Sequence, residues 1–137
     1  MLEAARCVAD VQAKLIRLDA VLKVKSQGSD ASDQVQSFLI TRQNESTQAL
    51  NDADNELTRA NMAVAVVASD GVCDAFNTMI GTLRNVSQKV LTDGAVDQYS
   101  ANREDIQKAL NVLVRAIRAE LLMTSTHQSS ESSALGS

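Results

Sequence analysis

Residues that could carry chemistry are scarce in this chain of 137 residues. The single histidine, His127, lies in a serine-rich stretch, and Cys7 and Cys73 lack the spacing of a metal site. A Ser-His-Asp or Cys-His arrangement would require that stretch to fold back onto the rest of the protein. The sequence contains no Glu-x-x-His pair, which is the pattern of di-iron sites in helical bundles. Its glycines stand too far apart for a phosphate-binding loop. We therefore predict a protein that is not an enzyme and that uses no cofactor and no metal.

The informative polar residues lie near the connection between two stretches with helical periodicity, residues 72–91 and 102–123. If the two helices are antiparallel, the end of the first meets the start of the second, and their charged side chains lie together. Two interpretations remain open. The charges form ordinary surface ion pairs, which add little to stability, or they form a mixed-charge end at which phosphate or another subunit docks. The residues are Arg84, Lys89, Arg103, Glu104, Asp105 and Lys108.

The composition indicates which elements must hold these side chains. Apolar residues make up 45% of the chain, aromatic residues only 2%, and there is no proline and only five glycines. Sheets and irregular loops normally need proline and glycine, whereas long helices do not. The sequence therefore predicts an all-α protein with a core of Ala, Val, Leu and Ile. The net charge of −4 argues against wrapping of nucleic acid by a basic surface, but it leaves open a local basic track within an assembly.

Helical periodicity divides the chain into four regions that are joined by short connections. Residues 2–25, 72–91 and 102–123 each predict one helix. Residues 33–68 allow two interpretations, because the middle of this region has no apolar side chain: one long helix, or two helices that meet at residues 44–47, which we favour. The apolar seams of the first and last helices are Val8, Val11, Leu15, Leu18 and Leu22, and Ile106, Leu110, Leu113, Ile117 and Leu121.

These regions predict an up-down four-helix bundle over residues 1–123, with a fifth short helix if the second region breaks. Residues 124–137 form a serine-rich tail that we expect to be disordered. We expect no signal peptide and no membrane span, and hence a protein of the cytoplasm or of a virion. The cysteines fit small buried apolar positions in a reducing compartment, although a disulfide between them stays open. Gly81, inside the third helix, suggests a close helix crossing.

Residues 72–133 resemble the C-terminal half of rod-shaped plant virus coat proteins of the tobamovirus type. The family's aromatic-rich small sheet is absent, and a helical stretch, residues 46–68, stands in its place. A helix of the family opens with a Val-x-Asp pattern and continues to a glycine and an arginine-rich turn; the next opens with adjacent acidic residues, closes with Glu-Leu-Ile and leads to a serine-rich tail. The matching residues are Val72, Asp74, Thr78, Gly81, Arg84 and Asn85, then Glu104, Asp105, Ala109, Leu110, Val114, Ile117, Glu120, Leu121 and Leu122, and then residues 129–133.

The resemblance implies that RNA phosphates lie near Arg84 and Arg103 and that Asp105 faces a phosphate. It also implies that Asp74 makes a carboxylate contact between subunits. With the charges at the predicted helix connection, the candidates for binding RNA or phosphate are Arg84, Lys89, Arg103 and Asp105, and those for subunit contacts are Asp74 and Glu104.

Three functions remain open. The first is a non-enzymatic structural protein that self-assembles, in its sharpest form a coat subunit of a helical virion that packages RNA. The second is a helical adaptor or effector domain that binds a protein partner through one face of the bundle. The third is a four-helix ligand-sensing domain, which normally stands between membrane spans that we do not find in this sequence.

Overall fold

The computed structural model describes the backbone of residues 1–28, 32–93 and 97–136, and the side chains of residues 1–28, 32–92 and 97–123. Over these residues the protein is all-α, as predicted. The last helix was expected to end near residue 123 and to be followed by a disordered tail, whereas the described backbone continues as helix to Gly136. The side chains of residues 124–137, with His127, lie outside the described part. The helices are α1 (Leu2–Gln27), α2 (Asp33–Val67), α3 (Asp70–Asp93), α4 (Gln98–Ala101) and α5 (Arg103–Gly136).

The second region is a single helix, so the break that we favoured at residues 44–47 is wrong. The reason is Ser46, whose residue exposure is only 6%. Ser46 lies seven residues after the buried Leu39 and seven before the buried Ala53, so it takes a seam position of a regular heptad. The small side chain continues the packing face of α2, while the neighbouring polar residues point to solvent. Within the described part of the chain, a short helix, α4, forms instead in the connection before α5.

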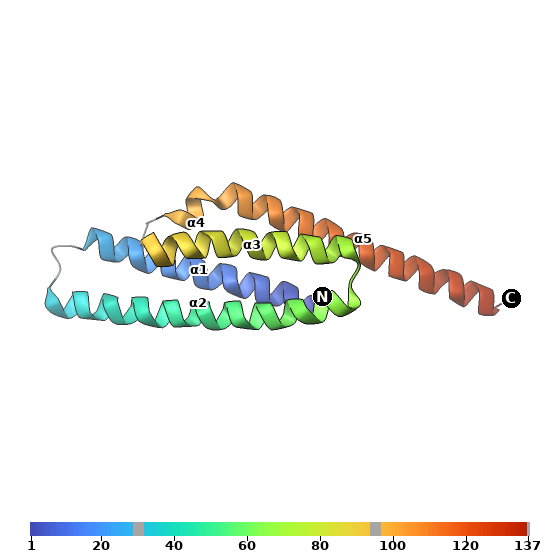
Figure 1. Ribbon diagram of the computed structural model, residues 1–137, viewed down its shortest axis with the longest axis horizontal. Helices are drawn as coiled ribbons and strands as arrows, with labels where there is room; N and C mark the ends of the chain where they lie inside the picture. Colours follow the sequence, from blue (N-terminus) through green and yellow to red (C-terminus); the bar gives the residue numbers. More distant parts are fainter. Residues whose placement is uncertain (29–31, 94–96, 137) are drawn as a thin grey trace.

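The long helices lie side by side along one axis, and the chain reverses direction at each connection (Figure 1). The closest pairs are α1 with α2 and α3 with α5, while α1 and α2 also approach α3. Short α4 fastens the connection to α1: Gln12 Nε2 donates to Tyr99 Oη at 3.3 Å, and the Gln98 backbone N–H donates to the buried Asp19 Oδ1 at 3.3 Å. The residue before α4, Asp97, has φ 62°, a left-handed conformation that aspartate tolerates better than most residues.

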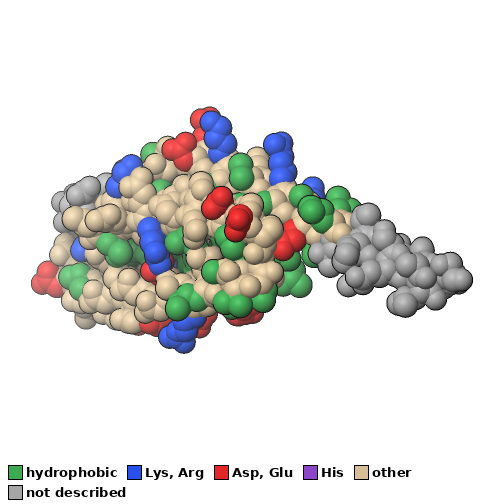
Figure 2. Space-filling view, turned by 45° about the vertical axis from the view of Figure 1, so that its right-hand side comes forward, with side chains coloured by type: hydrophobic (Ala, Val, Ile, Leu, Met, Phe, Trp, Pro, Cys, Tyr) green, Lys and Arg blue, Asp and Glu red, His purple; other side chains and the backbone are tan. Residues whose placement is uncertain are grey.

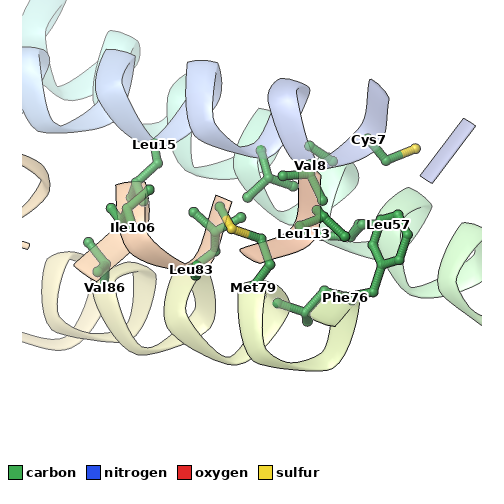
Figure 3. Packing of buried hydrophobic residues seen from close by; sticks show 14 of the residues in the cluster. Cys7, Val8, Leu15, Leu57, Phe76, Met79, Leu83, Val86, Ile106 and Leu113 are labelled. Atoms are coloured by element: carbon green, nitrogen blue, oxygen red, sulfur yellow. The ribbon is translucent and has the colours of Figure 1, made fainter. Parts of the chain in front are cut away.

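A single apolar core joins the four long helices. Figure 3 shows Phe76, Met79 and Leu83 of α3 meeting Leu113 of α5 and Val8 of α1. Full burial of one such side chain contributes about 1.5–3 kcal/mol to stability. All five predicted seam residues of the first helix are buried, which confirms that pattern.

Other apolar positions differ from the prediction. In α5, Ile106 and Leu113 are buried, but Leu110 and Ile117 are only partly buried. Leu121 is 51% exposed. Gly81 does not mark a close helix crossing, because it is exposed and a Cβ atom placed there would meet no atom within 4 Å. Periodicity thus identified the packing helices but did not show where along each helix its partner ends.

Candidate functional site

The charged residues that we predicted to lie together between the third and last helices do not all do so, because Arg84 faces α2 and not α5. Arg84 turns toward α2, where its Nε lies 3.2 Å from Asp54 Oδ1 and its Nη2 donates to Thr58 Oγ1 at 2.6 Å. The predicted juxtaposition of Arg84 with Arg103 is therefore wrong. Both groups of the Arg84 pair are partly solvent-exposed, so the pair adds little to stability, but it does direct the guanidinium away from α5.

The other predicted residues lie near the start of α5 or on α3. Lys89 is partly buried, Arg103 and Glu104 are exposed, and none of the three has an ion pair among the described residues. Asp74 is exposed on the second turn of α3. The predicted residues therefore do not form one cluster.

Asp105 lines a groove of about 650 Å³ between α3 and α5. The groove is wide here because Gly81 has no side chain and Ala109 has a short one. Its polar groups are hydroxyls, amides, one carboxylate and one ammonium, without a histidine or a cysteine. That set can hydrogen-bond a polar ligand but has no evident nucleophile paired with a base. The lining residues are Thr78, Gly81, Thr82, Asn85, Val86, Asn102, Asp105, Lys108, Ala109 and Val112.

The outer face of α5 carries two basic side chains, Arg115 and Arg118, that the sequence did not lead us to expect at a site, next to Lys108, which it did. Counted from the buried Ile106, Ala109 and Leu113, the positions of Lys108, Arg115 and Arg118 fall on the opposite, solvent-facing side of the helix. At 1.5 Å per residue these three span about 15 Å. Figure 2 shows Lys and Arg side chains projecting from the upper side of the molecule, where α5 lies. Helical spacing relative to the core stripe is the signal that could have found them.

A groove of about 380 Å³ lies between α1 and the first half of α2. Its wall includes Phe38, which is 57% exposed although it is one of only two phenylalanines in the chain. Arg42 holds its guanidinium carbon 5.3 Å from the centre of the Phe38 ring, a cation–π contact. We call this surface the basic tip. Its residues are Arg17, Ala20, Val21, Val24, Phe38, Leu39, Arg42 and Ser46.

The opposite end of the molecule also exposes large apolar side chains. Val66 is 84% exposed and Met62 is 68% exposed near the end of α2. Ser69, in the turn between α2 and α3, holds α5 to this end: its backbone N–H donates to Glu120 Oε1 at 3.1 Å, and its Oγ donates to Glu120 Oε2 at 3.2 Å. In Figure 2, green side chains gather beside the place where α5 leaves the bundle. We call this surface the acidic end, defined by Met62, Val66, Val67, Asp70 and Asp74.

Cys7 and Cys73 are both free thiols. Burial raises the pKa of the Cys7 thiol, and the nearby Glu3 carboxylate raises it further, so the group is less reactive than an exposed thiol. Among the described residues, no three side chains of the metal-binding types come together. Nor does any helix within those residues have the length and apolar character needed to cross a membrane.

No protein-family model, no curated protein and no solved structure matches this chain. The resemblance to rod-shaped virus coat proteins therefore remains a prediction.

Proposed function

We propose that this chain is a non-enzymatic structural protein that self-assembles. One observation carries the proposal: an elongated helical molecule exposes large apolar side chains at both of its ends. A monomer that functions alone rarely leaves such groups uncovered in clusters, because their burial is favourable. Association of copies covers them.

In its finer form the proposal describes an up-down four-helix subunit of a helical virion coat that packages RNA. The alternating direction of the long helices in Figure 1 supports the subunit topology. The resemblance of residues 72–133 to coat proteins and the basic outer face of α5 support the RNA. Phosphate contacts supply most of the affinity in binding that is independent of sequence, so Lys108, Arg115 and Arg118 offer a local basic track on an acidic chain. The cytoplasm and the virion are the locations that this function implies.

A second candidate is an adaptor that binds a protein partner through a bundle face. The basic tip favours it, since a groove with an exposed aromatic side chain and flanking arginines has the composition of a protein-binding hot spot. An adaptor covers its groove with another protein and remains monomeric or dimeric by itself.

Light scattering coupled to size-exclusion chromatography separates the two candidates. The protein is measured at neutral and at mildly acid pH, with and without single-stranded RNA, and the same samples are imaged by negative-stain electron microscopy. Self-assembly predicts particles of many subunits, and the coat function predicts rods that lengthen when RNA is added. A protein that stays monomeric under all four conditions contradicts the proposal and favours the adaptor.

A further inference from the structure

We propose that copies of this chain associate head to tail, with the acidic end of one copy seated on the basic tip of the next. The inference rests on the proposed self-assembly and names the two surfaces that meet. A second copy of the chain binds in the groove between α1 and α2.

The first argument is charge. Lys14 and Lys23 each lie within 3.7 Å of an aspartate, Asp10 and Asp97 respectively. Over residues 14–27, α1 carries four basic residues, Lys14, Arg17, Lys23 and Lys25, and one acid. That acid, Asp19, is buried and accepts the hydrogen bond from Gln98. The charged side chains that line the groove itself are Arg17 and Arg42. Arg42 Nη1 lies 3.7 Å from Glu45 Oε2 on the same helix, and Arg17 has no ion pair among the described residues, so the groove has a net positive lining.

The acidic end has the opposite character. Between Arg59 and Arg84 the chain contains no lysine and no arginine, and its two charged residues there are Asp70 and Asp74. Both carboxylates are exposed, on the first two turns of α3. Opposite charges on two surfaces direct association and fix its register.

The second argument is that each surface combines its charge with apolar side chains. Phe38 and Val24 stand exposed at the basic tip, and Met62 and Val66 at the acidic end. Apolar contact supplies the driving force, while the arginines at the groove and the aspartates of α3 lie around it as a polar rim. The same pairing gives Asp74 a contact between subunits, now with an arginine as its partner.

The direction of association follows from the difference between the two surfaces. Two basic tips repel each other, and so do two acidic ends, whereas a tip and an end attract. Because the surfaces lie at opposite ends of an elongated molecule (Figure 1), a copy bound at one surface leaves the other free. Such heterologous contacts generate an open chain when the rotation between copies does not close a ring.

Two single substitutions test the pairing, Phe38→Asp at the tip and Val66→Asp at the acidic end. Both side chains are more than half exposed, so the substitutions leave the core intact. Each variant alone is expected to remain monomeric by light scattering under conditions in which the parent assembles. An equimolar mixture is expected to stop at a one-to-one dimer, because each partner retains one intact surface. Val112→Asp, at a half-exposed position away from both surfaces, is the matched control and is expected to assemble like the parent.

Far-UV circular dichroism checks that each variant is folded, and Phe38→Ser and Val66→Ser replace any variant that is not. A parent protein that does not assemble overturns the proposed function itself. If the parent assembles and either variant alone still does so, self-assembly stands and the head-to-tail pairing is wrong. If each variant alone forms a dimer, like surfaces pair with like. If both variants are monomeric and their mixture is monomeric too, the tip and the acidic end do not bind each other. Either result contradicts the inference.

Discussion

The first and last long helices carry similar apolar stripes in the sequence, yet the fold uses them differently. All five stripe residues of α1 are buried, and its backbone approaches α2, α3 and α4. Within the described residues α5 approaches α3 and α4. Only Ile106 and Leu113 of its stripe are buried, Leu110 and Ile117 are partly buried, and Leu121 is 51% exposed. An apolar stripe therefore shows that a helix packs, and the number of its neighbours decides how much of the stripe is covered.

The largest expected effect follows from placing a charge at different points of these stripes. Leu15→Asp puts a carboxylate into a fully buried position of α1 without a partner, and we expect a loss of about 3 kcal/mol or more and an unfolded domain. Ile117→Asp, at a partly buried site, is expected to lower the melting temperature less. Leu121→Asp, at a half-exposed site, is expected to change it little.

Thermal unfolding followed by circular dichroism measures this gradient. Equal melting temperatures for the Ile117 and Leu121 variants would contradict the greater burial of Ile117. A Leu15→Asp variant that melts like the parent would contradict the packing of α1.

The outer face of α5 gives the next comparison, because its cations are exposed while Arg84 is bound to α2. For single-stranded RNA, Arg115→Gln together with Arg118→Gln is expected to weaken binding and to reduce the salt dependence. The slope of log K against log salt should fall by about 1.4, or about 0.7 for each lost phosphate contact. Arg84→Gln is the control and is expected to leave the slope unchanged.

Fluorescence anisotropy with a labelled oligonucleotide, repeated over a range of salt concentrations, measures both slopes. An unchanged slope in the double variant would remove α5 from the RNA contact. A reduced slope in the Arg84 variant would show that its ion pair with Asp54 opens to bind phosphate.

The helices and the buried apolar stripe of α1 could be predicted from the sequence, because heptad spacing depends only on residues near each other in the chain. It was insufficient at Ser46, since a polar residue at a seam position breaks an apolar pattern without breaking the helix. It was also insufficient for Arg84, whose partner depends on how α2 and α3 align, and no spacing within one helix specifies that alignment.

The smallest expected effect concerns the thiol at the start of α1. Because burial raises the pKa of Cys7, less thiolate is present at neutral pH, and the thiol should react with an aromatic disulfide more slowly than an exposed one. We expect this reaction in a Cys73→Ser background to follow opening of the core, since α1 is held by three neighbours.

An added thiol at Ala119→Cys, exposed on α5, is expected to react at the rate of a free thiol in the same background. Leu15→Ala should then accelerate the reaction of Cys7 and leave that of the α5 thiol unchanged. Equal rates at the two positions before any destabilising change would mean that the start of α1 opens as readily as the surface of α5, and the contrast between the two helices would be lost.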